Sequence, residues 1–141
     1  MIKMETRSNK EIVFYIPYPS TQKGKTSFNK RFGMNAYWSG KHYKARAQDS
    51  KEIHDLVFYC LKKEGIRKHI FQVPVEINFY WHSNLDIDNN AVLGKMIVDG
   101  LKGYLLKDDG PKYFQKVTHE YWDGKSIKVV IKEYERKGKD L

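Results

Sequence analysis

Residues 75–81 read Val-Glu-Ile-Asn-Phe-Tyr-Trp, and apolar side chains alternate with more polar ones along them. The apolar positions are Val75, Ile77, Phe79 and Trp81. A period of two is typical of a β-strand that buries one face. The segment that follows changes to a helical period, and a strand that leads into a helix favours an α/β fold.

The predicted helix extends from Asn89 to Gly103. One helical face collects the apolar residues Val92, Leu93, Met96, Ile97 and Leu101, and another collects the polar residues Asp88, Lys95, Asp99 and Lys102. Asp88 is expected to cap the first turn of this helix. The stretch Lys107–Pro111 (KDDGP) then indicates a turn.

Three further strands and one further helix are expected around this unit. Glu11–Pro17 is rich in β-branched and aromatic residues, which predicts a first strand. Two late strands, about Tyr113–Trp122 and Ser126–Tyr134, are expected to form a hairpin through the Asp123-Gly124 turn. The second helix is expected to start near Asp49 and to end at Gly65, with an apolar stripe of Ile53, Leu56, Val57, Cys60 and Leu61.

We therefore expect an α/β fold, with a small mixed sheet of four or five strands and two main helices packed on it. The 141 residues, of which 40% are hydrophobic, suit one domain over 1–141, with 136–141 as a frayed tail. Cys60 is the single cysteine, which excludes an internal disulfide and a thiolate zinc site. No apolar run is long enough to span a bilayer, so we expect no membrane contact and a cytoplasmic location.

The charge balance favours a polyanionic partner. Lys and Arg number 26 against 17 Asp and Glu, for a formal net charge of +9. Ser20–Arg46 is expected to form a mobile loop with a short strand near Asn35–Trp38, and it places basic residues among aromatic ones. This composition suits contact with nucleic acid, although a solvated loop accounts for it equally well. The candidate DNA contacts are Lys23, Lys25, Lys30, Arg31, Lys41, Lys44 and Arg46.

Two acids follow the strand over 75–81. Asp86 and Asp88 are separated by one residue, so on an extended chain they point the same way and can share one cation. This spacing is weak evidence by itself, because Glu133 and Glu135 show it as well. A solvated loop and a helix cap explain it without a metal.

The order of these motifs resembles the RusA-type Holliday junction resolvases, small dimeric endonucleases that cut four-way DNA junctions with magnesium. The matching residues are Asp86-Ile87-Asp88-Asn89, then Lys95, then Asp99-Gly100-Leu101, then Asp108-Asp109. Ile16-Pro17-Tyr18-Pro19 also matches the proline-containing end of the first strand in that family. The resemblance covers most of the chain in element order, but its specific residues lie between Asp86 and Asp109.

The resemblance implies a role for each matching residue. Asp86, Asp88 and Asp109 would be metal ligands for Mg²⁺, with Mn²⁺ as a substitute, and Lys95 would be the catalytic lysine. Asp99 is expected to be structural and to pair with Lys95 or Lys102. Asp108 is the less favoured ligand of its pair.

The chain departs from the family pattern at two positions. Lys95 follows Asp88 by seven residues, which is about one helical turn more than in the family. Leu85 stands where a basic residue is common.

The resemblance further implies a homodimer that binds branched DNA and uses no small-molecule cofactor. A divalent-metal-dependent endodeoxyribonuclease is accordingly the expected activity. The first alternative is a catalytically weak or inactive branched-DNA-binding protein of the same fold. A nucleotide-sugar transferase and a protein-interaction domain are weaker alternatives, and the former lacks a glycine-rich strand-to-helix turn.

The histidines show no metal-ligand spacing, and they remain open between structural and supporting roles. His82 shares strand parity with Asp86, but a solvent-facing residue is favoured. His119 could approach the acids, but a structural cross-strand pair is favoured.

Overall fold

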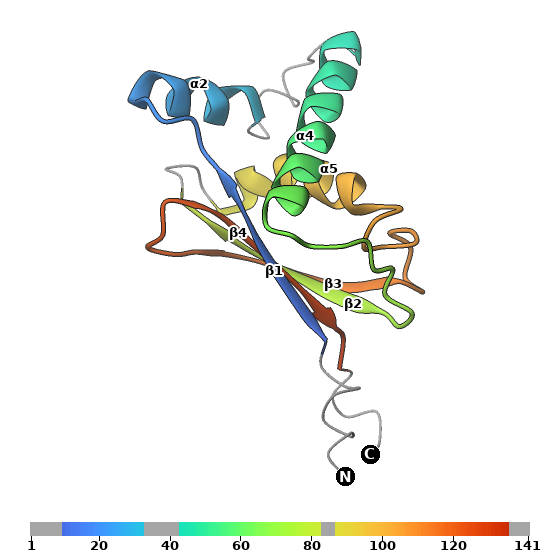
Figure 1. Ribbon diagram of the computed structural model, residues 1–141. Coiled ribbons are helices and arrows are strands. Elements are labelled where there is room, and N and C mark those ends of the chain that lie inside the picture. The colour runs from blue at the N-terminus through green and yellow to red at the C-terminus, as the bar shows by residue number, and fades with distance from the viewer. Residues whose placement is uncertain (1–9, 33–42, 83–86, 136–141) are drawn as a thin grey trace.

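The computed structural model describes residues 10–32, 43–82 and 87–135, and a mixed four-stranded sheet forms its centre (Figure 1). The strands lie in the order β1 (Glu11–Pro17), β4 (Ser126–Glu133), β2 (Val75–Trp81) and β3 (Phe114–Tyr121). The predicted α/β class and mixed sheet are confirmed. The bounds expected for the first strand and for residues 75–81 are also confirmed.

Strand β2 lies inside the sheet and pairs on both sides. Ile77 faces Ile131 of antiparallel β4 and Val117 of parallel β3. The four apolar residues of the alternating pattern, from Val75 to Trp81, are all 0% exposed. The alternation therefore marks the buried face of a strand, as the sequence predicts, and the structure adds that this strand is an interior one.

The predicted hairpin between the two late strands is wrong. β3 and β4 are joined by a short turn, but β2 lies between them in the sheet. The backbone N–H of Trp122 donates to the carbonyl of Trp81 at 3.2 Å, so the connection passes the end of β2. An Asp-Gly turn reverses the chain but does not choose the strand partner, and here β2, with its fully buried apolar face, lies between the two strands that the turn joins.

Two helices, α4 (Tyr43–Lys63) and α5 (Ala91–Leu101), pack together and cover one face of the sheet, as expected (Figure 1). The predicted stripe of α4 faces inward, with Ile53, Val57, Cys60 and Leu61 at most 3% exposed. Gly65, with φ +72°, ends the helix, because its N–H bonds to the Lys62 carbonyl while that of Ile66 bonds to the Leu61 carbonyl.

The predicted start of α4 at Asp49 is wrong, since the helix begins six residues earlier at Tyr43. Asp49 lies inside the helix and is only 3% exposed. The Nε of Arg31 donates to its Oδ1 at 2.7 Å. A carboxylate can be buried when a guanidinium pairs with it, so an acid that resembles a helix cap here serves a tertiary ion pair.

The loop expected over Ser20–Arg46 is wrong where the structure describes it, because Gln22–Phe32 forms a third helix, α2. Thr21 caps it, with Oγ1 accepting the Gly24 N–H at 2.9 Å. The rings of Phe28 and Phe32 pack 4.8 Å apart on one side of this polar helix. The expected strand near Asn35–Trp38 and the expected tail over 136–141 lie outside the described residues.

The entry into α5 also differs from the prediction. A 3-10 turn, η1 (Ile87–Asn90), precedes the helix, and the N-cap position belongs to Asn90 rather than to Asp88. Asn90 is 2% exposed and makes no side-chain capping bond. The expected cap at Asp88 is therefore wrong, because the tighter turn delays the α-helical bonds by two residues.

Among the three described helices, none is both long and apolar enough to cross a membrane.

The left-handed backbone at Gly65 gives a stability test. Gly65→Ala should lower the free energy of unfolding by about 1 kcal/mol, since a Cβ at this φ is strained although open space surrounds it. Urea denaturation measures the change. Gly110→Ala is the control, because Gly110 is equally open and its φ is not in the left-handed region. Equal stability of the two variants would contradict the prediction.

Candidate functional site

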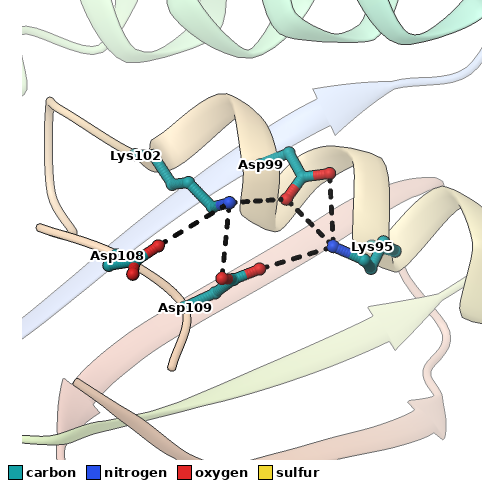
Figure 2. Close-up of polar contacts among 5 residues, drawn as sticks. All are labelled: Lys95, Asp99, Lys102, Asp108 and Asp109. Carbon is teal, nitrogen blue, oxygen red and sulfur yellow. Dashed lines mark hydrogen bonds and ion pairs between the residues drawn. The ribbon is translucent and has the colours of Figure 1, made fainter. Parts of the chain in front are cut away.

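Two lysines and three aspartates form an ion-pair cluster between α5 and the loop that carries Asp108 and Asp109 (Figure 2). The Nζ of Lys95 lies 3.1 Å from Oδ1 of Asp99 and 3.4 Å from Oδ2 of Asp109. The Nζ of Lys102 lies 3.3 Å from Oδ1 of Asp99, 3.3 Å from Oδ1 of Asp109 and 3.9 Å from Oδ1 of Asp108. These five residues are called the Lys-Asp cluster below.

Helical spacing and a fixed turn bring the cluster together. Asp99 is four residues after Lys95 on one face of α5, and Lys102 follows Asp99 by three residues as the C-cap, so its side chain also reaches this face. The chain then returns through Leu105 and Leu106, which are at most 1% exposed and anchor the loop. This anchored return carries the following aspartates back to the helix.

The predicted pairing of Asp99 is confirmed, and Asp99 bonds to both lysines rather than to one of them. The seven-residue spacing of Asp88 and Lys95 does not keep the lysine from the acidic turn, because its ammonium reaches Asp109. Asp108 has an exposed side chain and makes only the longest contact of the cluster. Of the two neighbouring aspartates, Asp109 therefore makes the closer contacts with the lysines.

Asp109 is held as a carboxylate by its two lysines. Burial by itself would raise its pKa, but hydrogen bonds from Lys102 and then Lys95 outweigh burial and lower the pKa. Its side chain is 28% exposed, so solvent and ions can still reach it. Near neutral pH, Asp109 is thus a carboxylate whose oxygens can accept hydrogen bonds or bind a cation.

Both lysines remain protonated. Burial alone would lower the pKa of Lys95, but its bonds to Asp99 and Asp109 raise the pKa overall. The pKa of Lys102 is raised in the same way, with burial opposed by Asp99 and then Asp109. Neither lysine can therefore serve as a general base near neutral pH, and both can donate to an anion.

A cleft of about 260 Å³ opens beside the cluster, between α5 and β3. Its walls are largely apolar, and its polar groups are Lys95, Asp109 and His119. The apolar lining consists of Phe79, Ala91, Gly94, Val98, Phe114 and Val117. A few polar groups in an apolar cleft are typical of a ligand site.

Two other clefts adjoin basic residues predicted to bind DNA. One of about 420 Å³ lies between α4 and α5 and includes Arg46 with Lys95 and Asp99. Another, of about 450 Å³, is lined by Lys25 of α2 and by aromatic residues that include Trp122. Lys95 thus lines both the cleft between α5 and β3 and the cleft between α4 and α5, and the latter also contains Arg46.

The remaining candidate DNA contacts divide among helices. Lys23, Lys25, Lys30 and Arg31 lie on α2, Lys44 and Arg46 lie on α4, and Lys41 lies outside the described residues. Arg31 contacts Glu52 at 2.9 Å in addition to Asp49, so its guanidinium is bound by two acids. Arg31 is consequently the least suited of the set to a phosphate.

The other two predicted metal ligands cannot be placed with Asp109. Asp86 lies outside the described residues, and of Asp88 only the backbone, within η1, is described. Over 10–32, 43–82 and 87–135, no three acidic, histidine or cysteine side chains gather as a metal group. The meeting of three carboxylates around one ion remains a prediction.

The donor chemistry at Asp109 fits magnesium. Mg²⁺ prefers oxygen ligands and keeps several waters, so a few carboxylates suffice. The Lys-Asp cluster holds one more carboxylate than ammonium, which leaves a negative site on a basic chain. Each oxygen of Asp109 contacts one ammonium, so an ion at Asp109 would either share these oxygens with the lysines or replace a lysine contact.

Sequence reasoning did not select Lys102 or His119 as site residues. From the sequence, Lys102 is expected only as a possible partner of Asp99, although its seven-residue spacing from Lys95 already indicates that the two lysines lie on one side of the helix. His119 depends on the parallel pairing of β2 with β3, which no local pattern indicates. Its expected structural pairing is confirmed, since Nε1–H of Trp81 donates to its Nδ1 at 3.0 Å.

His82, for which the sequence favours a solvent-facing position, is half-buried directly after β2, and its backbone N–H donates to the hydroxyl of Tyr18 at 3.2 Å.

No protein-family model matches the chain, and no curated protein matches it.

The charge state of Asp109 gives a test of the cluster. Lys102→Met should raise the pKa of Asp109, because the ammonium that stabilises its carboxylate is lost. Carbon-detected NMR titration of the carboxyl measures the shift. The folded protein should accordingly lose stability at a higher acidic pH than the wild type, since a depressed carboxyl pKa stabilises the fold until the pH falls through it. Lys62→Met, on α4, is the control and should leave Asp109 unchanged.

Proposed function

We propose that this protein is a magnesium-dependent, structure-selective endodeoxyribonuclease that resolves four-way and related branched DNA junctions by paired nicks. The observation that carries the proposal is the contact between Lys95 and Asp109, 3.4 Å apart and 14 residues distant in sequence. The resemblance to RusA-type resolvases implies a catalytic lysine and a metal ligand at these two positions. The fold brings them to one cleft.

The proposed chemistry follows from the charges. A phosphodiester is anionic and repels an attacking hydroxide. Magnesium, held by Asp86, Asp88 and Asp109, would neutralise the phosphate and acidify the attacking water. Lys95 stays protonated, so its ammonium can donate to the phosphate oxygens as negative charge grows in the transition state. Asp99 holds that ammonium at the cleft through its bond at 3.1 Å.

The substrate class is supported by the basic surface. Lys25 and Arg46 border clefts, and the chain carries a net charge of +9. Lysine and arginine contacts to backbone phosphates give recognition of DNA shape rather than of a long sequence. Two opposed nicks require two sites, which a two-fold homodimer would supply.

A second candidate is a branched-DNA-binding protein of this fold that does not cut. The observation that favours it is that both oxygens of Asp109 contact ammonium groups, at 3.3 Å to Lys102 and 3.4 Å to Lys95. If these contacts persist in the presence of metal, Asp109 stays a structural ion pair. Junction binding with a steep salt dependence and no cutting in Mg²⁺ or Mn²⁺ would select this candidate.

Neighbouring aspartates provide a matched test of the nuclease. Asp109→Asn should slow cleavage of a labelled four-way junction in Mg²⁺ by at least roughly a hundredfold, about 3 kcal/mol in the barrier. Asp108→Asn should cut within a few fold of the wild type. The Asp108 side chain is 60% exposed, and its one contact in the cluster, to Lys102, is long at 3.9 Å. Single-turnover gel assays measure both rates, with linear duplex beside the junction.

Asp88→Asn extends the test to the undescribed part of the site. It should abolish cutting while junction binding stays intact or tightens, since a negative charge near phosphate is removed. Undiminished cleavage by Asp88→Asn and Asp109→Asn would reject the nuclease. Equal losses in the Asp108 and Asp109 variants would reject the specific role of Asp109.

A further inference from the structure

His119 is held rigidly at the floor of the cleft between α5 and β3. Its ring stacks on Phe79, with centroids 5.4 Å apart and planes 10° apart, and on Trp81, with centroids 5.9 Å apart. Gly94 of α5 lies over it, and a Cβ at Gly94 would come within 3.2 Å of Cε1 of His119. The imidazole therefore has little freedom to turn.

The bond to Trp81 determines which nitrogen of His119 carries the proton. An indole N–H can only donate, so Nδ1 of His119 accepts at 3.0 Å and is itself unprotonated. In the neutral ring the proton then resides on Nε2, which becomes a donor. Among residues 10–32, 43–82 and 87–135, none is hydrogen-bonded to that Nε2.

The ring is favoured in its neutral form. Burial lowers the pKa of His119. A proton on Nδ1 would also face the indole N–H and break the bond to Trp81. Near neutral pH the group is thus an uncharged N–H donor and cannot accept a proton at Nε2.

We propose that Nε2–H of His119 binds a non-bridging oxygen of the DNA phosphate that enters the cleft beside Lys95 and Asp109. This inference rests on the proposed function. The cleft is lined by all three residues, and its other walls are apolar. In such surroundings a fixed donor strengthens an anion's binding more than it would in water, and Lys95 adds the charge that a neutral imidazole lacks.

A substitution that keeps the ring tests the donor. His119→Phe preserves an aromatic ring against Phe79 and Trp81 but removes the Nε2–H, together with the Nδ1 that accepts from Trp81, and it should lower kcat on the four-way junction roughly tenfold to a hundredfold. KM should change little if the bond strengthens in the transition state. His119→Gln, which supplies an amide N–H, should recover part of kcat. His69→Phe is the control, since His69 is exposed and lies outside the cleft.

An NMR measurement on the wild-type chain gives a readout that does not depend on cutting. Nitrogen spectra of His119 should show the Nε2–H tautomer, and its Nε2–H signal should move on titration with junction DNA in the absence of metal. An unmoved signal, or His119→Phe cutting at the wild-type rate, would overturn the inference while leaving the nuclease intact. A wild-type chain that binds the junction and moves this signal without cutting would instead reject the nuclease and retain His119 as a phosphate donor.

Discussion

The close approach of α5 to the sheet at Gly94 is the constraint on which the candidate site depends. A side chain there would come within 3.2 Å of His119 and 3.5 Å of Phe79, so glycine lets the helix lie directly on the rings of β2 and β3. The next residue, Lys95, then emerges at the rim of the cleft. The packing of α5 on the sheet therefore also places Lys95 and His119 in the same cleft.

The Lys-Asp cluster joins two segments that have opposite local character. α5 is a mostly buried helix with one polar face, and that face supplies Lys95 and Asp99. The turn before β3 supplies acids beside the buried Leu105 and Leu106. Mutual pairing lowers the pKa of Asp109 and raises the pKa of Lys95, so this carboxylate and this ammonium both stay charged near neutral pH and can bind ions of opposite charge. A cation and an anionic phosphate could each compete for these contacts, which makes the cluster suited to exchange its partners.

Sequence reasoning succeeded where a pattern reported burial directly and failed where stability came from partners far along the chain. The period of two over β2 and the apolar stripe of α5 gave the elements and their inner faces. Helix α2 was missed because it is mostly polar, although Thr21 offered a capping signal. The hairpin prediction was wrong because the Asp-Gly turn is a local signal, whereas the place of β2 between β3 and β4 depends on pairing between strands far apart in the sequence.

The amino-acid order alone established the α/β class, the shared helical face of Lys95, Asp99 and Lys102, and the acidic turn after it, because periodicity and turn chemistry act within a few residues. It could not establish that the turn folds back to within 3.4 Å of Lys95, or that Trp81 fixes the tautomer of His119. Those contacts span 14 and 38 residues. The first forms when the buried Leu105 and Leu106 anchor the return of the chain, and the second forms when β2 pairs in parallel with β3, since loop closure and core packing bring such distant groups together.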